Sequence, residues 1–120
     1  MGYYGGGQGV FGSIQAAHDA EPIAQEAGKK FDEGKVDLTF LAEYFPLACE
    51  AVCRVSMYGE QKYKARGGWH AVPDGFVRYT RAMWRHLFAE EEGIDEESDQ
   101  PHIAMTAWNA LARLELKLRG

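Results

Sequence analysis

Two carboxylates and a cation fall at positions where they could act together on a metal ion. Glu43, Glu50 and Arg54 lie in a segment whose other residues are mostly apolar or small. At 100° per residue of a helix, their side chains project within about 40° of one another. Placed in a cleft between helices, two such carboxylates would bind a divalent cation. An ordinary solvated helix face is the alternative interpretation of the same pattern.

A second group of residues is suited to binding a phosphate chain. The stretch YGEQKYKARGGW, residues 58–69, places Lys62, Lys64 and Arg66 at alternate positions, followed by two glycines and Trp69. Its cations would neutralise a triphosphate, while the tryptophan ring would stack on a base. A charged surface turn would have a similar sequence, so the neighbouring segments must decide between the two.

A third group is a polar stripe near the end of the chain. His102, Thr106, Asn109 and Arg113 follow one another at spacings of four, three and four. Thr and Asn are poor helix formers that compete for backbone hydrogen bonds, so helix propensity does not explain them in an Ala- and Leu-rich segment. An Asn amide can both donate to and accept from a purine edge. Apolar residues are expected to face away from this stripe: Ile103, Ala107, Leu111, Leu114 and Leu118.

The segment before this stripe adds cations and a histidine. Arg78, Arg81 and Arg85 form a basic stripe that would hold phosphate oxygens bidentately, or would simply be solvated. His86 lies four residues before Glu90, which is the spacing of an intrahelical pair, and it is also a candidate for phosphate binding.

An acidic run, residues 90–99, supplies further carboxylates. Most of them are expected to face solvent or to lie near helix ends. If Asp95 from this run converges with Glu43 and Glu50, the three form an all-oxygen site suited to Mg²⁺ or Mn²⁺.

The elements that must position these residues are predicted to be helices. Apolar residues recur at spacings of three and four over 38–57, with Pro46 predicting a kink or a late start. The same periodicity predicts helices over 75–91 and 101–118, and a short helix is expected over 19–28. Because no segment alternates with period two, the fold class is all-α: a compact bundle of three long helices and a short N-terminal one.

Length and composition limit the remaining possibilities. At 120 residues the chain fits one domain, 19–120, preceded by a Gly-rich flexible arm, 1–18. The net charge of -5 argues against binding a nucleic acid polymer. No stretch approaches the roughly 20 apolar residues of a membrane span, and no secretory signal is visible. The expected location is therefore the cytoplasm.

Four blocks of sequence carry a resemblance to a known family. They read FDEGKVDLTFLAEYFPLACEAVCRV, YGEQKY followed by Trp69, FVRYTRAMWRHLFA, and GIDEESDQPHIAMTAWNALARLEL. In this order they resemble the phage dATP/dGTP pyrophosphohydrolases, a branch of the MazG-like all-α NTP pyrophosphatases, from Lys30 to Leu116. Some relatives come from phages that replace adenine with 2-aminoadenine.

The resemblance implies an activity, a cofactor and an assembly. The activity is hydrolysis of a purine deoxynucleoside triphosphate, dATP or dGTP, to the monophosphate and pyrophosphate, with Mg²⁺ or Mn²⁺. The assembly is a homo-oligomer, a dimer or tetramer, with sites between chains. MazG-like enzymes bind metal through ExxE and ExxD motifs on two helices, whereas Glu43 and Glu50 lie seven residues apart. A non-catalytic nucleotide-binding or helical oligomerisation protein is the alternative.

Within that resemblance the candidate residues take three roles. Metal binding is expected of Glu50, which is also expected to be catalytic, and further of Glu43 and Asp95. Phosphate binding is expected of Lys62, with an additional catalytic role, and of Arg81, Arg85 and His86. Base or sugar recognition is expected of Trp69, His102 and Asn109.

Overall fold

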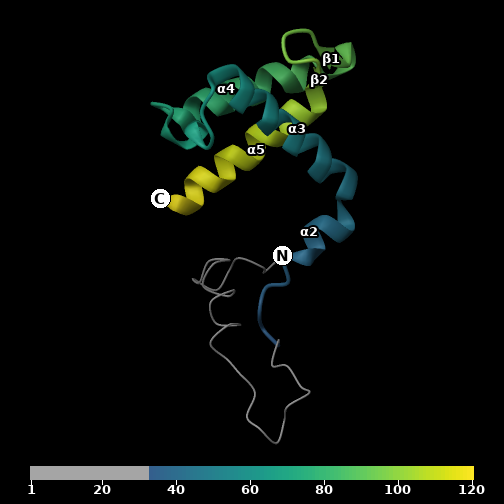
Figure 1. Ribbon diagram of the computed structural model, residues 1–120, viewed down its shortest axis with the longest axis vertical. Helices are drawn as coiled ribbons and strands as arrows, with labels where there is room; N and C mark the ends of the chain where they lie inside the picture. Colours follow the sequence, from purple (N-terminus) through teal and green to yellow (C-terminus); the bar gives the residue numbers. More distant parts are fainter. Residues whose placement is uncertain (1–32) are drawn as a thin grey trace, which may run out of the picture. The chain divides into compact units, whose positions relative to one another are not determined.

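The computed structural model describes residues 33–120, and these are mostly helical (Figure 1). The chain divides between Phe40 and Leu41 into two units, and everything described below from Leu41 onward belongs to the second. The predicted all-α class, with three long helices, is confirmed. The predicted arm, 1–18, and the predicted short helix, 19–28, lie outside the described residues.

The first predicted helix is broken in two at a proline. Helix α2 spans Thr39–Tyr44 and helix α3 spans Pro46–Tyr63, with Phe45 between them at φ −131° and ψ 51°. A proline disfavours helical dihedrals in the residue before it, but it is well tolerated at the first helical position. Glu43 and Glu50 therefore lie on different helices. Glu43 thus does not share the helix face of Glu50 and Arg54, and the common direction predicted for all three is wrong.

Helix α3 also extends further than predicted, into the basic stretch. Lys62 lies in its last turn, and Lys64 ends it in the left-handed conformation at φ 54°. Gly67, at φ 73°, then begins a short 3₁₀ helix, η2, over Gly68–Ala71. A positive φ is readily adopted by glycine because it lacks Cβ. The chain thus turns sharply between Lys62 and Trp69.

Helix α4 spans Gly75–Phe88, and a 3₁₀ turn, η3, follows over Glu90–Glu92. A minimal antiparallel hairpin comes next: β1, Ile94–Asp95, pairs with β2, Gln100–Pro101. Ile94 faces Pro101 and Asp95 faces Gln100 in its register. No strand was predicted here, since two residues are too few to show an alternation.

Helix α5, His102–Arg119, packs against both α4 and α3 (Figure 1). Its buried side combines polar and small residues, because His102 and Asn109 are 7% and 3% exposed and Ala104 and Ala112 are buried beside them. The other buried residues of the described chain are Val55 and Ser98. The polar stripe predicted on this helix therefore faces the interior, and its apolar counterpart faces outward.

Large apolar side chains remain exposed along α2, α3 and α5. Leu47 is 81% exposed, and Ile103, Leu111, Leu114 and Leu118 form an exposed row along α5. None of the described helices combines the length and the apolar character needed to cross a membrane.

Candidate functional site

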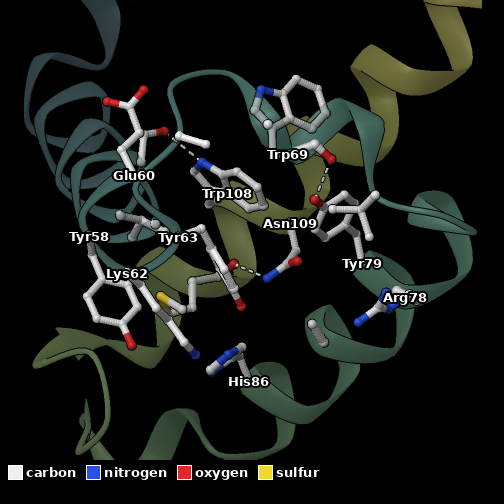
Figure 2. A pocket seen from close by; sticks show the side chains of 18 of the residues that line it. Tyr58, Glu60, Lys62, Tyr63, Trp69, Arg78, Tyr79, His86, Trp108 and Asn109 are labelled. Carbon is white, nitrogen blue, oxygen red and sulfur yellow. Dashed lines mark hydrogen bonds between the residues drawn. The ribbon is translucent and has the colours of Figure 1, made fainter.

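A cavity of about 990 Å³ lies between α3, α4 and α5, and the loop that contains η2 closes one side of it (Figure 2). This volume is within the range that accommodates a nucleotide-sized ligand. Side chains reach it from every surrounding element, as the labelled residues Lys62, Trp69, Tyr79 and Asn109 show. The cavity is thus built by segments far apart in the sequence.

Eight of the residues selected from the sequence line this cavity: Lys62, Arg66, Trp69, Arg78, Arg85, His86, Asp95 and Asn109. His102 lies directly behind it, with its Nδ1 atom 2.9 Å from Nδ1 of His86. The structure therefore brings the second and third groups of candidate residues together.

Glu43, Glu50 and Arg81 are not among the residues that line the cavity. Glu50 forms an ion pair with Arg54 one turn further along α3, and its side chain is 58% exposed. Exposed pairs of this kind contribute little to stability. Within one chain, the two carboxylates of the first group thus point to solvent and not into the cavity.

Three aromatic rings form one wall of the cavity (Figure 2). The ring centroids of Trp69 and Trp108 are 6.0 Å apart, and those of Tyr79 and Trp108 are 5.4 Å apart, both nearly edge to face. Two hydrogen bonds fix this wall: the Tyr79 hydroxyl donates to the Trp69 carbonyl at 2.5 Å, and Trp108 Nε1 donates to Ser56 Oγ at 2.7 Å. Such rings offer a preformed surface for a planar base.

Cations lie along another part of the same cavity. Arg78 and Arg85 reach it from α4, and Lys62 reaches it from α3. The Lys62 ammonium donates to the Glu97 carboxylate, and this hydrogen bond holds the pKa of Lys62 well above its usual range. The same contact lowers the pKa of Glu97. Lys62 is thus a permanent cation at the edge of the cavity.

Two imidazoles and a carboxylate meet at the end of the cavity next to the hairpin. One ligand atom from each of His86, Asp95 and His102 can be chosen so that all three lie within 4.8 Å of one another. They come from α4, from β1 and from the first turn of α5. Partial burial, the largest influence, lowers the pKa of His86, while the Asp95 charge opposes that shift.

The hairpin holds Asp95 in place. Ser98 donates to Asp95 Oδ2 twice, from its hydroxyl at 2.6 Å and from its backbone N–H at 3.0 Å. Burial alone would raise the pKa of Asp95, but these hydrogen bonds and the nearby His86 outweigh it, so the pKa lies below its ordinary value. Asp95 is therefore an oriented, ionised carboxylate. An oriented carboxylate and two imidazoles form a donor set that fits a divalent cation.

Four residues of the site were not selected from the sequence. Tyr79 and Trp108 complete the aromatic wall, Glu97 pairs with Lys62, and Ser98 orients Asp95. The helical period was a usable signal for Tyr79, because it lies seven residues before His86 and so on the same face. Glu97 and Ser98 had no such signal, since their roles depend on a turn without regular periodicity.

The all-α chain thus combines an aromatic wall and a cationic edge in one cavity, with a cluster of potential metal-binding donors beside it, an arrangement suited to a nucleotide. The profile of the dATP/dGTP diphosphohydrolase N-terminal domain matches residues 25–120, and the chain belongs to this family. The family predicted from the sequence is thereby confirmed. Neither a curated protein nor a solved structure matches the chain.

Proposed function

We propose that the chain hydrolyses purine deoxynucleoside triphosphates, dGTP and dATP, to the monophosphate and pyrophosphate with a divalent metal ion. The observation that carries this proposal is one cavity that is lined by an aromatic wall and by cationic side chains and that borders the cluster of His86, Asp95 and His102. Membership of the dATP/dGTP diphosphohydrolase family supports the substrate class.

In this proposal the aromatic wall binds the purine ring. Trp69 and Trp108 give it two indole surfaces, and Asn109 lies at the back of the cavity between α3 and α4 (Figure 2). The amide nitrogen of Asn109 donates to the Met105 carbonyl at 2.8 Å. Its carbonyl oxygen, which accepts no hydrogen bond within residues 33–120, is then available to a donor on the base or sugar.

The phosphate chain runs along the cationic edge towards the hairpin. Lys62 and Arg85 lie on opposite helices that border this part of the cavity, so they contact the chain from two sides. Arg guanidinium groups bind phosphate oxygens bidentately, and Lys acts as a point charge. His86, Asp95 and His102 would hold a divalent cation at the end of this path, and such a cation would polarise a phosphoryl oxygen and activate water.

The exposed carboxylates on α2 and α3 fit this proposal only in an assembly. Glu43 and Glu50 are exposed on helices that also expose Leu41 and Leu47, and Phe45 between these helices is exposed as well. We infer that a second copy covers this apolar surface and that the chain is a dimer or tetramer. In such an assembly these carboxylates are candidates to complete the metal site of a neighbouring chain.

The experiment is a product assay on the full chain with each common nucleoside triphosphate and with Mg²⁺ or Mn²⁺. Pyrophosphate and deoxynucleoside monophosphate are expected from dGTP and dATP. Diphosphate with orthophosphate would contradict the assigned bond, and tight binding without products would indicate a nucleotide-binding protein. Glu50→Gln tests the metal ligand that was predicted from the sequence. Loss of turnover with an unchanged melting temperature would support a role of Glu50 in metal binding, and full activity would contradict that role.

A further inference from the structure

We propose that His86, Asp95 and His102 bind a transition-metal cation of the Mn²⁺, Co²⁺ and Zn²⁺ class in preference to Mg²⁺. The proposal deepens the proposed function, since it names the residues that hold the metal. Only the role of the cation in hydrolysis depends on the proposed function. The site itself is inferred from the geometry of three side chains and of their immediate neighbours.

The two histidine rings face each other through the same kind of atom. Nδ1 of His86 lies 2.9 Å from Nδ1 of His102, with the ring centroids 5.2 Å apart. Two nitrogen lone pairs at this distance repel each other unless a proton or a cation lies between them. The carboxylate of Asp95 is beside both rings, within 4.8 Å. Three donors from three separate elements thus converge on one point.

The surroundings of His102 favour the form of the ring that binds a cation. Its other nitrogen, Nε2, faces the Glu92 carboxylate at 3.6 Å, and the side chain is otherwise buried. A carboxylate at Nε2 favours the proton on that atom and leaves the Nδ1 lone pair free. An imidazole that binds a metal through one nitrogen commonly has a carboxylate near its other N–H, and Glu92 lies on that side of His102.

The surroundings of Asp95 also favour the binding of a cation. Ser98 occupies Oδ2 with two hydrogen bonds, while Oδ1 accepts none from the described part of the chain. Ser98 is itself only 6% exposed, so the orientation of the carboxylate is fixed from inside the hairpin. One carboxylate oxygen therefore remains for a cation that the two histidines also contact.

A cation can reach this point from solvent through an acidic hollow. A second depression, of about 490 Å³, is lined by Asp95 and His102 together with Glu92, Glu96 and Glu97. Negatively charged carboxylates around a concave surface raise the local concentration of cations. The donor cluster thus lies between this hollow and the nucleotide-sized cavity, where a bound cation is accessible from both.

The donor types decide which cations are preferred. Mg²⁺ prefers oxygen ligands, whereas imidazole nitrogen suits Zn²⁺ and other first-row transition metals. Of the two cations expected from the sequence, Mn²⁺ is therefore favoured over Mg²⁺ at this position. Affinity is expected to rise from Mn²⁺ to Co²⁺ to Zn²⁺ in the usual order for mixed nitrogen and oxygen sites.

The test measures metal binding by the full chain in the absence of nucleotide. After treatment with a chelator, Zn²⁺ and Co²⁺ are titrated by calorimetry and by visible absorption of Co²⁺. One ion per chain is expected, with Mg²⁺ at least tenfold weaker. His86→Gln and Asp95→Asn are expected to lose more affinity than the roughly 10- to 100-fold cost of losing an outer-shell partner. His70→Gln, at an exposed histidine outside the cluster, is the matched control.

A second measurement keeps the test decisive if a variant fails to fold. In the unaltered protein, Zn²⁺ is expected to shift the ring-nitrogen NMR signals of His86 and His102 and to leave those of His70 in place. Unshifted His86 and His102 signals, or His86→Gln that binds Zn²⁺ as tightly as the unaltered chain, would overturn the site. Pyrophosphate release is measured separately, so hydrolysis without histidine-bound metal would refute the site and leave the function standing.

Discussion

Lys62, in the last turn of α3, is paired with Glu97, 35 residues away in the turn of the hairpin. The same carboxylate accepts a hydrogen bond from the Tyr58 hydroxyl at 3.3 Å. Glu97 thus already binds the Lys62 ammonium group, which in the proposed function binds a phosphate of the substrate. A triphosphate that binds here must displace a carboxylate that the protein itself supplies.

Opposite effects are therefore expected from changing the two partners. Lys62→Met should raise the KM for dGTP roughly 10- to 100-fold, which corresponds to about 1.5–3 kcal/mol for a hydrogen bond to a charged group. Glu97→Gln should lower the KM, because it removes a competing negative charge. Steady-state pyrophosphate release measures both. A raised KM in both variants would show that Glu97 takes part in binding instead of competing with the substrate.

Two arginines on α4 provide a matched comparison. Arg85 lines the cavity, whereas Arg81, one turn earlier, does not. Arg85→Met is expected to raise the KM for dGTP about tenfold or more, since it removes a charged contact to phosphate. Arg81→Met is expected to have the smaller effect. If Arg81→Met raised the KM more than Arg85→Met in the same assay, the phosphate chain would have to bind on the outer side of α4.

The three tryptophans separate base binding from general effects. Trp69 and Trp108 belong to the aromatic wall, while Trp84 is 50% exposed and stacks on Phe88 outside the cavity. Addition of dGMP is expected to quench tryptophan fluorescence in the unaltered protein and in Trp84→Phe. Trp69→Ala is expected to weaken dGMP binding by about 1–3 kcal/mol, the usual value of stacking on a base. Quenching that disappears only in Trp84→Phe would contradict the assignment of the wall.

Assembly is expected to use the exposed apolar row of α5 in addition to the apolar residues exposed on α2 and α3. Leu111 and Leu118 are 50% and 61% exposed on the face that turns away from α4 and α3. Leu111→Glu and Leu118→Glu together should convert a dimer or tetramer to a smaller species, because a buried unpaired charge is costly. Light scattering after gel filtration measures the mass, with Gln61→Glu on exposed α3 as the control. An unaltered mass in the double variant would place the interface elsewhere.

Much of the helical framework could be predicted because periodicity is a local property. Helix α4 begins at Gly75 as expected, and α5 begins one residue after the predicted start. Of the kink or late start predicted at Pro46, the late start is confirmed, because α3 begins at Pro46 and this separates Glu43 from Glu50. The helical angle that joined these residues holds only along an uninterrupted helix.

The sequence allowed the residues of the candidate metal cluster to be selected, but not the prediction that these residues lie together. His86, Asp95 and His102 were all selected, but Asp95 was assigned to a metal site and the two histidines to the substrate. Their proximity depends on the hairpin, which turns the chain back so that His102 N–H donates to the Gly93 carbonyl at 2.8 Å. The bonds from Ser98 to Asp95 that stabilise this turn leave no periodic pattern in the sequence.

Helix α5 presents polar groups to its own chain and hydrocarbon to its surroundings, which reverses the arrangement usual in a soluble monomer. Little hydrophobic free energy is then gained when one chain folds alone, and more becomes available when copies meet. Dilution below the dissociation constant of the proposed assembly should accordingly loosen the packing around His102 and Asn109 as well as separate the copies. Protein concentration would thus act as a control on the candidate site itself.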